Sequence, residues 1–555
     1  MIRSASAMRI FAFVLLSALA WASSLAAQSP VPTPQQLAWQ RMELTMFCHF
    51  GVNTFTNREW GEGTEEEKIF NPTALDCRQW ARAASAGGFK LMILTAKHHD
   101  GFCLWPSKFT DHSVRSSPWK NGQGDVVKEF VTACRAEKLK VGLYLSPWDR
   151  HEKTYGTEAY NDYFCNQLTE LLSNYGQIDE VWFDGACGEG PNGKKQVYDW
   201  KRIYPLIRKL QPQALIAIMG PDIRWVGNES GVAREGESSV VTRDGQPAWH
   251  PAECDVSIRP GWFYHADQDA KVKSLDQLVD IYFKSVGRNS VLLLNVPPDQ
   301  RGLFADADVK RLEEFGAAVR GFQGGLVASG TGAQTVEFGG VKTFNLANFQ
   351  EDISKGEQVK SYRLEVRKAG QWDVVATGRV LGARNLHRLP EIQAEAARLV
   401  VESAGSPLVK WSLHHVTPVG PWSKGGASLT AGKPTTASNV HGNSTEFGGD
   451  KAVDGDKETR WATSDEIREC WLEVDLLKER EFSKLGISEL EPRITKFRIE
   501  TRDQPEGEWK PVFTGEKAGK DFHANFAPVK ARYVRLHVLE ATFAPTIWEF
   551  ELWDK

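Results

Sequence analysis

The chain has 555 residues, of which 67 are basic, 71 are acidic and 20 are tryptophan. This length exceeds what one hydrophobic core supports, so it predicts two to four domains. Because the charges nearly balance, no global field attracts nucleic acid or an anionic membrane, and neither partner is expected. Most of the tryptophans would fill cores, while a minority would offer a flat apolar face to sugar rings.

Residues 1–27 have the pattern of a secretory signal peptide. Arg3 and Arg9 supply positive charge, Ile10 to Trp21 form a short apolar run, and residues 24–27 are small enough for cleavage. The run is too short to span a bilayer comfortably, and no cysteine stands at the cleavage point, so no membrane anchor is expected. The sequence therefore predicts an exported protein, periplasmic or secreted.

Residues 35–325 alternate between short apolar runs and helix-like stretches. The expected strands are 91–96, 141–145, 180–183, 215–219 and 291–296. The expected amphipathic helices are 125–137, 159–172 and 275–285. Strand, helix and strand at this spacing predict a parallel sheet, and the length suits a (β/α)8-like barrel.

The rest of the chain has a different pattern, in which glycine-rich turns separate alternating segments. Residues 326–420 and 427–555 are each predicted to form a β-sandwich, so the fold class is α/β plus all-β. The segment 359–366 resembles 494–500, and later stretches match in the same order. Two related sandwiches in tandem explain this repeat, with the glycine-rich link 420–426 as the seam.

Eight cysteines stand singly along the chain, without C-x-x-C pairs. This argues against zinc ribbons and thioredoxin-type redox chemistry. Several lie in apolar stretches, among them Cys48 and Cys103. Buried free thiols are the favoured interpretation, but an exported protein can pair some cysteines, so the pairing stays open.

One carboxylate stands where a buried strand ends. The apolar segment 181–183 leads directly into Asp184 and Gly185. In a barrel, the carboxyl ends of the strands form the catalytic face, and a nucleophile must be held rigidly there. The alternative is an aspartate that caps the following helix. The pattern favours the catalytic role.

His98 and His99 follow the strand 91–96 at the same predicted face. Adjacent residues on a strand point in different directions, so both would bind one metal only if the backbone turned. Their spacing also lacks the helical pattern of zinc proteases. Histidines that bind sugar hydroxyls, or core histidines satisfied by neighbours, are the favoured interpretations.

A glycosidase would need a second carboxylate near Asp184. Four candidates lie in a glycine- and charge-rich stretch after the strand 215–219: Glu229, Glu235, Glu237 and Glu253. For any single one of them, a solvated loop residue is the commoner case. The pattern alone does not choose among them.

Taken together, the chain resembles glycoside hydrolase family 29, the α-L-fucosidases. The matching segments keep the family order across the whole barrel: 47–51, 58–60, 97–102, 142–144, 182–185, 257–264 and 292–295. The resemblance implies that Asp184 is the nucleophile that forms a covalent fucosyl-enzyme. It also implies that catalysis needs no metal or organic cofactor.

The same resemblance implies a set of sugar-binding residues. Four side chains would hold the fucose hydroxyls: His49, His98, His99 and Tyr144. Trp262 would lie against the apolar face of the sugar, and Glu59 and Trp60 are weaker matches to the same pocket.

The acid/base position varies within this family. The segment 224–229 is similar to that of the branch acting on α-1,3 and α-1,4 linkages in branched, Lewis-type glycans. In that branch the glutamate of this segment is the acid/base, which implies Glu229, with Glu235 and Glu237 in reserve. The predicted protein is therefore a retaining exo-α-L-fucosidase acting by double displacement on fucosylated oligosaccharides or glycoconjugates.

Residues 427–555 resemble a discoidin-like module, of the coagulation factor 5/8 type C kind. Such modules often bind a structural Ca2+, and four positions match: Asp454, Asp456, Thr459 and Glu549. A plain Asp-Gly turn is the alternative. The resemblance also implies carbohydrate binding by this module. The middle sandwich shows no ion loop and is interpreted as a packing domain.

Three rival functions fit parts of the same pattern. They are a glycosidase of another specificity, a metal-dependent hydrolase using His49, His98, His99 and Asp184, and a non-catalytic glycan-binding protein. The ordered histidine matches argue against the first, and the presence of both carboxylates argues against the third. The sequence leaves the exact linkage, the natural glycan and the oligomeric state open.

Overall fold

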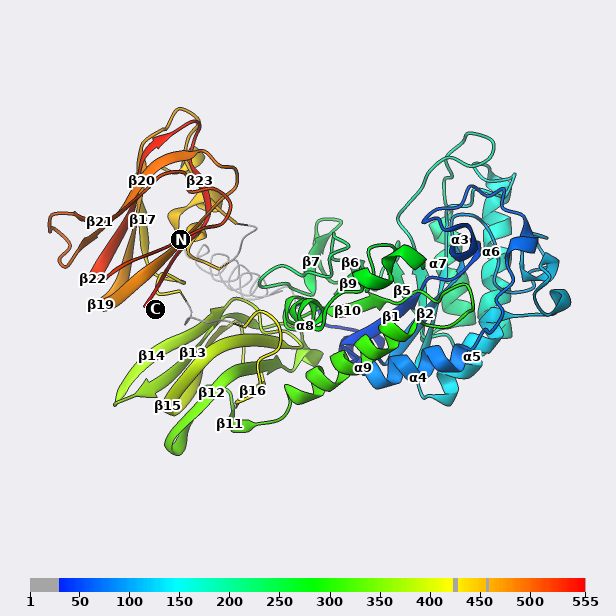
Figure 1. Cartoon of the computed structure of the whole chain (residues 1–555), viewed down its shortest axis with the longest axis horizontal. Coiled ribbons are helices and arrows are strands. Elements are labelled where there is room, and N and C mark those ends of the chain that lie inside the picture. Colours follow the sequence, from blue (N-terminus) through cyan, green and yellow to red (C-terminus); the bar gives the residue numbers. More distant parts are fainter. Residues whose placement is uncertain (1–28, 423–427, 456–458, 555) are drawn as a thin grey trace, which may run out of the picture.

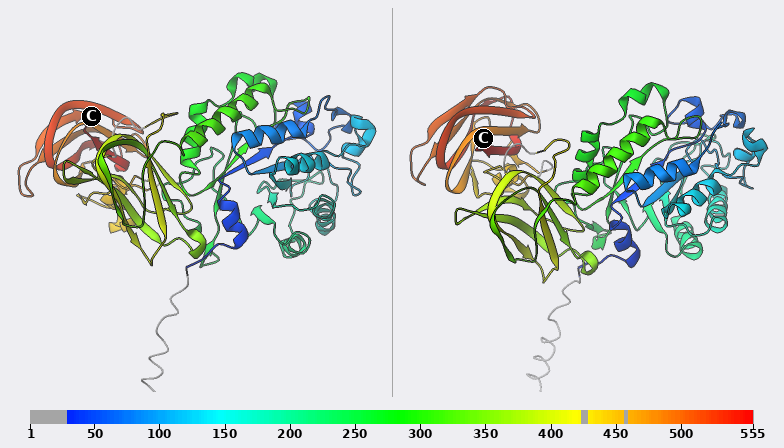
Figure 2. Two further views of the ribbon diagram at one scale, coloured as in Figure 1. Left: turned by 90° about the horizontal axis from the view of Figure 1, so that it is seen from below. Right: turned by 60° about the horizontal axis from the view of Figure 1, so that its bottom comes forward.

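The computed structural model describes residues 29–422, 428–455 and 459–554. The expected signal peptide and Asp456 lie outside the described residues. The described chain forms a barrel followed by two β-domains (Figure 1). In the rotated views the middle β-domain lies between the barrel and the C-terminal β-domain (Figure 2).

The barrel is an eight-stranded sheet whose neighbouring strands are all parallel. Its strands are β1 (Leu44–Cys48), β2 (Leu91–Lys97), β3 (Lys140–Leu145), β4 (Glu180–Phe183), β5 (Leu215–Ile218), β6 (Arg224–Trp225), β9 (Ala252–Ser257) and β10 (Val291–Asn295). The order is β5-β4-β3-β2-β1-β10-β9-β6, and a bridge between Ala217 and Ile223 brings the two edges together. The predicted barrel is confirmed.

Helices alternate with these strands. They are α2 (Pro34–Gln40), α3 (Val52–Thr56), α4 (Cys77–Gly87), α5 (Val126–Ala136), α6 (Glu158–Asn174), α7 (Trp200–Leu210), α8 (Leu275–Lys284) and α9 (Asp306–Gly321). Aspartates cap α4, α5 and α7 by accepting backbone N–H groups of the first turn. Between β5 and β9, where the described chain has no helix, a loop and the hairpin β7 (Val240–Arg243) and β8 (Gln246–Trp249) take the place of one.

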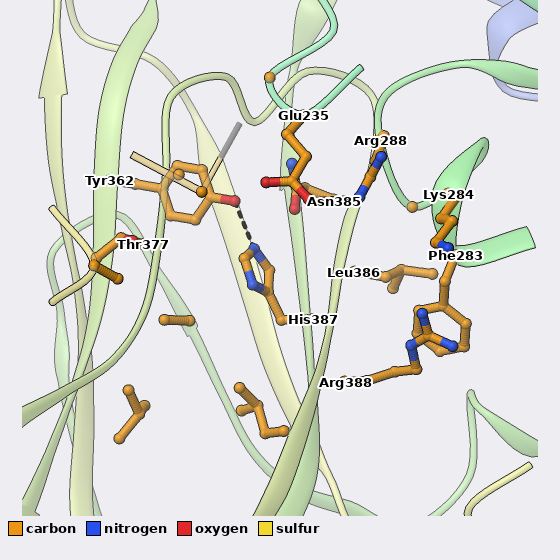
Figure 3. A pocket seen from close by; sticks show the side chains of 18 of the residues that line it. Glu235, Phe283, Lys284, Arg288, Tyr362, Thr377, Asn385, Leu386, His387 and Arg388 are labelled. Atoms are coloured by element: carbon orange, nitrogen blue, oxygen red, sulfur yellow. Dashed lines mark hydrogen bonds and ion pairs between the residues drawn. The ribbon is translucent and has the colours of Figure 1, made fainter. Parts of the chain in front are cut away.

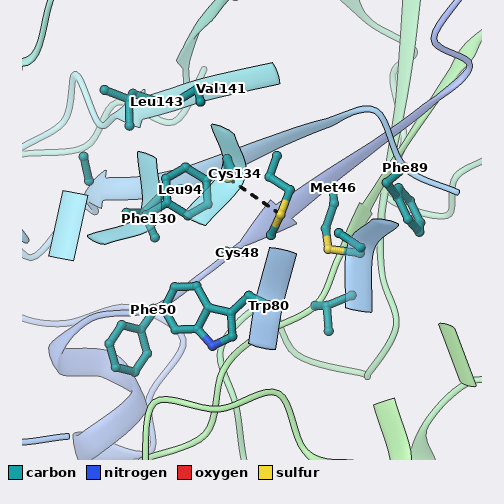
Figure 4. Packing of buried hydrophobic residues seen from close by; sticks show 14 of the residues in the cluster. Met46, Cys48, Phe50, Trp80, Phe89, Leu94, Phe130, Cys134, Val141 and Leu143 are labelled. Carbon is teal, nitrogen blue, oxygen red and sulfur yellow. Dashed lines mark hydrogen bonds between the residues drawn. The ribbon is translucent and has the colours of Figure 1, made fainter. Parts of the chain in front are cut away.

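Several barrel strands are almost entirely apolar because both of their faces are covered. All seven residues of β2 are buried, as are all five of β1 and β10. Figure 4 shows Met46 and Leu94 from the sheet packed against Trp80 of α4 and Phe130 of α5. Fully burying a side chain of this size contributes about 1.5–3 kcal/mol relative to leaving it exposed. The eight cysteines are all unpaired, and seven of them are buried.

The middle domain is an antiparallel sheet in the order β11-β16-β12-β15-β13-β14. The strands are β11 (Leu326–Thr331), β12 (Thr335–Glu351), β13 (Val359–Lys368), β14 (Gln371–Gly378), β15 (Asn385–Ser403) and β16 (Val409–His414). The long strands β12 and β15 carry register shifts, which bend the sheet around its own core of residues such as Phe344, Leu364 and Trp411.

The C-terminal domain repeats this plan. Its strands are β17 (Thr435–Ala437), β18 (Trp461–Ala462), β19 (Cys470–Glu489), β20 (Ile494–Arg502), β21 (Lys510–Gly515), β22 (Phe522–Ala541) and β23 (Thr546–Trp553). The order β18-β23-β19-β22-β20-β21 corresponds strand for strand to that of the middle domain. The two segments that resemble each other in sequence are the matching strands β13 and β20. Among the described residues, no helix combines the length and apolar character needed to cross a membrane.

Candidate active site

A pocket of about 390 Å³ lies at the carboxyl ends of the barrel strands. Eight of the nine predicted catalytic and sugar-binding residues line it: His49, Glu59, Trp60, His98, His99, Asp184, Glu229 and Trp262. The ninth, Tyr144, is buried and contacts Asp184. A larger cleft, of about 580 Å³, lies where the three domains meet and contains neither Asp184 nor Glu229 (Figure 3).

Asp184 directly follows β4, and its carboxylate is held at both oxygens. Oδ1 accepts a hydrogen bond from the backbone N–H of Ala186 at 2.7 Å, and Oδ2 accepts one from the Tyr144 hydroxyl at 3.2 Å. The Nε2 atom of His99 lies 3.9 Å from Oδ2. The side chain keeps 29% of its surface exposed. Asp184 is therefore a fixed and accessible carboxylate.

The surroundings of His49 fix its tautomer. Asn295 donates through Nδ2 to the carbonyl of Trp262, so its Oδ1 accepts the Nδ1–H of His49 at 2.8 Å. The Nε2 atom of His49 is then left as a hydrogen-bond acceptor. Burial lowers the pKa of His49 to about 4, against the opposing effects of Asn295 and the charge of Asp184. His49 is neutral near pH 7, and its Nε2 can accept a hydrogen bond from a hydroxyl group.

His99 is fixed in the same way. The Ser146 hydroxyl donates to the carbonyl of Trp148 at 2.6 Å and therefore accepts the Nδ1–H of His99 at 2.7 Å. Its Nε2 is thus an acceptor. Burial lowers the pKa of His99 to about 4, although the charge of Asp184 works in the other direction.

Both adjacent histidines line the pocket, with ring centroids 4.1 Å apart. Both follow β2, which ends at Lys97, so the alternation of side chains along a strand does not apply to them. The register between β2 and β3 also shifts between Thr95 and Lys97, just before these residues. Burial and the two neighbouring histidines hold the pKa of His98 well below its ordinary value, so this ring is also neutral near pH 7.

Glu229 is the candidate acid that reaches the pocket. Its Oε2 accepts a hydrogen bond from the indole N–H of Trp262 at 3.3 Å. The Trp262 ring lies 5.3 Å from that of His49, so Trp262 connects the two sides of the pocket. Glu59 accepts the backbone N–H of Trp262 at 2.7 Å and contacts His265 at 2.5 Å. Glu59 therefore holds the segment that carries Trp262, while Trp60, 53% exposed, stands at the pocket mouth.

The other three candidate acids lie elsewhere. Glu235 lines the three-domain cleft, and Glu237 is buried in an ion pair with Arg224. Glu253 is not a loop residue: it is fully buried in β9 and accepts the indole N–H of Trp182 at 2.8 Å. The charged residues of β9 interrupt its apolar pattern, which is why the sequence did not indicate a strand there.

Two further side chains of the pocket, which were not predicted from the sequence, form a hydrogen bond with each other. Trp225 in β6 is 42% exposed, and its indole N–H donates to Asp255 of β9 at 2.6 Å. Burial raises the pKa of Asp255 to about 7, and the nearby charges of Glu229 and Asp184 add to this effect. A carboxylate placed between apolar strand residues was the available signal.

The residues proposed for metal chemistry do not gather into a ligand set. Within the ranges that the structure describes, no group of three or more His, Cys, Asp or Glu side chains is arranged to hold a metal ion. His49, His98, His99 and Asp184, the ligands that the rival metal-dependent hydrolase would use, are therefore not arranged as a metal site. In the C-terminal loop, the Thr459 hydroxyl lies 2.9 Å from the Asp454 carboxylate, and Glu549 is buried on β23.

A parallel barrel whose strand ends gather a fixed carboxylate, a second acid, neutral histidines and tryptophans is the architecture of a glycoside hydrolase. Residues 24–321 match the family model Alpha-L-fucosidase, and residues 434–550 match the F5/8 type C domain. Alpha-L-fucosidase 1 of Arabidopsis thaliana is 42% identical over 447 residues, which cover 69% of this chain and 87% of the plant protein.

Solved structures agree. A glycoside hydrolase 29 family member from an unknown rumen bacterium is 33% identical, covers 94% of this chain and 99% of its own, and superposes with a TM-score of 0.68. A mutant family 29 fucosidase of Ruminococcus gnavus, solved with fucose, is 27% identical, covers 95% of both chains and gives a TM-score of 0.50. The chain belongs to the α-L-fucosidases of glycoside hydrolase family 29 and carries a discoidin-like domain at its C-terminal end.

Proposed function

We propose that this α-L-fucosidase is a retaining exo-enzyme that releases fucose from α-1,3- and α-1,4-linked, Lewis-type glycans. The observation that carries the proposal is the pairing, in one pocket, of the doubly hydrogen-bonded Asp184 with Glu229. In this mechanism Asp184 attacks the anomeric carbon while protonated Glu229 gives its proton to the leaving oxygen. Glu229 then deprotonates the water that releases fucose with retained configuration.

The same pocket suits a single sugar residue. His49 and His99 each offer an Nε2 acceptor for a fucose hydroxyl, and Trp262 offers an apolar face. These groups are fixed before substrate arrives, which favours rapid positioning of the ring. The exposed Trp60 and Trp225 at the mouth would lie beside the sugar that leaves. The linkage preference rests on the similarity of the segment 224–229 to that branch of the family.

The test uses wild type, Asp184→Ala and Glu229→Ala on a Lewis-type trisaccharide and on an aryl α-L-fucoside with a good leaving group. Wild type should release fucose from the trisaccharide. NMR during the reaction should detect the α-anomer of fucose before the β-anomer. Asp184→Ala should lose both activities. Glu229→Ala should lose far more activity on the trisaccharide than on the aryl fucoside, because a good leaving group needs little acid assistance.

Azide should partly rescue Glu229→Ala by replacing the activated water and should give a fucosyl azide. Substantial activity of Asp184→Ala would disprove the nucleophile. A β-anomer as first product would disprove retention. Absence of fucose release from the trisaccharide, with activity on the aryl fucoside, would disprove the linkage assignment.

We also propose export, on the strength of the apolar run and the small residues that follow it within 1–27. N-terminal sequencing of the mature protein after cell fractionation tests this. A mature chain that begins near residue 28 in the periplasm or medium supports it. A cytoplasmic chain that retains residues 1–27 contradicts it.

The C-terminal loop is proposed to hold a structural Ca2+ through Asp454, Asp456, Thr459 and Glu549. Glu549 fits this role, because it is 4% exposed and its Oε1 has no hydrogen-bond partner. Burial, with the charges of Glu551 and Asp454, raises the pKa of Glu549 to about 9, a cost that a bound cation would remove. Chelation should lower the unfolding temperature of wild type and not that of Glu549→Gln; equal unfolding temperatures with and without chelator in wild type would refute the ion.

A further inference from the structure

Glu229 stands on an irregular loop, residues 226–239, here called the acid loop. The loop joins β6 to β7. Three of its glycines have left-handed backbone angles: Gly227 at φ 103°, Gly231 at 73° and Gly236 at 72°. Glycines of this kind give a free chain many alternative conformations. The position of Glu229 therefore depends on what anchors the loop on either side of it.

The first anchor lies in the barrel. Ala233 is buried, and its N–H donates to the carbonyl of Lys284 at 2.8 Å. The guanidinium of Arg288 donates to the carbonyl of Ala233 at 2.8 Å and pairs with Glu235 at 2.6 Å. In Figure 3 Glu235 and Arg288 lie at the three-domain cleft, facing Tyr362 and His387 of the middle domain.

The second anchor comes from the middle domain. The carboxylate of Glu357, just before β13, accepts hydrogen bonds from the Ser238 hydroxyl at 2.6 Å and from the Ser239 N–H at 2.9 Å. It also receives the side-chain amide of Asn289 at 2.6 Å. The same amide donates to the carbonyl of Glu237 at 3.0 Å. One carboxylate of the middle domain thus closes the end of the acid loop against the barrel.

The middle domain also holds the barrel segment that carries these anchors. Arg288 forms a β-bridge with Asn385 at the start of β15. The N–H of Asn289 donates to the carbonyl of Arg384 at 3.0 Å, and the Oδ1 of Asn289 accepts the N–H of Ala383 at 2.7 Å. Both residues that grip the acid loop are therefore themselves fixed by the middle domain.

We propose that the middle β-domain is part of the catalytic apparatus, and that Glu357 is a positioning residue for the acid/base Glu229. The inference rests on the proposed function of Glu229. It replaces the interpretation of this domain as packing alone. Asp184 directly follows β4 and is held by Ala186 and Tyr144, none of which belongs to the acid loop. Loss of the Glu357 anchor should therefore impair proton donation and leave nucleophilic attack intact.

The leaving group separates these two effects. The leaving oxygen of a glycan must be protonated as the glycosidic bond breaks, whereas a nitrophenolate leaves without a proton. Moving an acid by about 1 Å can cost about a hundredfold in rate. Glu357→Ala should lower kcat/KM for the trisaccharide by about tenfold to a hundredfold and change that for the aryl fucoside by less than about threefold.

The experiment compares wild type, Glu357→Ala, Glu357→Gln and Glu391→Ala on both substrates. Glu391 is the matched control, because its carboxylate binds Asn345 and His415 within the middle domain and does not contact the acid loop. Glu391→Ala should leave the ratio of the two activities unchanged. Glu357→Gln keeps one acceptor oxygen and should fall between wild type and Glu357→Ala. Azide should partly rescue Glu357→Ala, as is expected for Glu229→Ala.

Equal losses on both substrates in Glu357→Ala, or no loss on either, would overturn the inference. If Glu357→Ala does not fold, Ser238→Ala keeps Glu357 and removes the serine hydroxyl that donates to it and that also contacts the backbone of Val240. This variant should shift the same ratio in the same direction. If Glu229→Ala itself lacks the leaving-group dependence, the proposed acid/base is wrong. The dependence in Glu229→Ala with none in the Glu357 and Ser238 variants disproves the positioning role alone.

Discussion

The hydroxyl of Tyr144 lies 3.2 Å from Oδ2 of Asp184 and donates a hydrogen bond to it. Tyr144 is fully buried and stacks on Trp182 at 5.3 Å between ring centroids, so its hydroxyl is aimed at the carboxylate by packing. Burial and the adjacent Asp184 hold the pKa of Tyr144 well above its ordinary value, so the phenol remains a donor. Asp184 is thus oriented by a rigid neutral group.

Tyr144→Phe should keep the fold and weaken catalysis. A hydrogen bond to a charged acceptor contributes about 1.5–3 kcal/mol, which corresponds to about a tenfold to a hundredfold loss of kcat/KM. Kinetics of wild type and Tyr144→Phe on the aryl fucoside measure this loss. An unchanged kcat/KM would show that the Tyr144 hydroxyl does not assist the carboxylate in catalysis.

A second prediction concerns Asp255, whose pKa is raised to about 7 by burial and by the charges of Glu229 and Asp184. An unfolded aspartate titrates near pH 3.9, so the folded protein holds an extra proton between about pH 4 and 7. Below about pH 4 Asp255 is protonated in the folded protein and does not lower the free energy of unfolding. Above about pH 7 it is ionised, and the full cost of its buried charge lowers the free energy of unfolding. Its contribution therefore makes the free energy of unfolding fall as pH rises from about 4 to 7.

Asp255→Asn should remove this part of the pH dependence. Urea unfolding of wild type and variant at pH 5 and pH 8 gives the difference, in which titrating groups distant from Asp255 cancel. The wild type should lose more stability than the variant between the two pH values. Equal losses would show that Asp255 is ionised across this range.

The barrel and most of the pocket could be predicted because the informative residues are local. Buried strands such as β4 lead directly into Asp184, and a run of apolar residues before a carboxylate is visible in one segment. The meeting of both histidines in one pocket was harder to predict, since they lie beyond the end of β2, next to a register shift between β2 and β3. The apolar pattern of one strand does not reveal where such a shift occurs.

The acid loop shows what sequence patterns omit. Glu229, Glu235 and Glu237 look alike in a glycine-rich segment, yet one lines the pocket, one the three-domain cleft, and one pairs with Arg224. The groups that separate them, such as Arg288 and Glu357, lie far along the chain. Contacts of this kind come from tertiary packing, which local composition does not encode.

A third prediction concerns a buried ion pair below the histidines. Lys97 Nζ lies 2.7 Å from Asp149 Oδ2, and both side chains are fully buried. Burial opposes ionisation of Asp149, but the charge of Lys97 and two backbone N–H donors hold its pKa below the ordinary value. Lys97→Met would leave this charge buried and unpaired. Chemical unfolding should show a loss of about 3–5 kcal/mol.

The double variant Lys97→Met/Asp149→Asn should lose less than Lys97→Met alone, because no unpaired charge remains. Lys140→Met is the matched control, because it removes an ion pair with Asp179 in which the Lys140 side chain is 45% exposed. It should lower the free energy of unfolding by less than about 1 kcal/mol. Equal losses for Lys97→Met and Lys140→Met would contradict the buried-charge argument.

The last prediction follows from the cysteines. All eight are unpaired, and Cys187 alone is partly exposed. Its Sγ lies 3.5 Å from the Tyr155 hydroxyl, beside the pocket wall formed after Asp184. Burial raises the pKa of thiols such as Cys48 and Cys103, which keeps them protonated and unreactive. A thiol reagent should therefore modify one group in the native protein and eight in denaturant without reductant.

Cys187→Ser should remove the fast native reaction and leave the denatured count at seven. A denatured count of six in wild type would instead reveal a disulfide. Reductant should not alter the thermal unfolding temperature, because no cross-link restricts the unfolded chain. A drop of several degrees on reduction would show that oxidation during export joins cysteines that the described fold keeps apart, since seven of the eight lie buried within their domains.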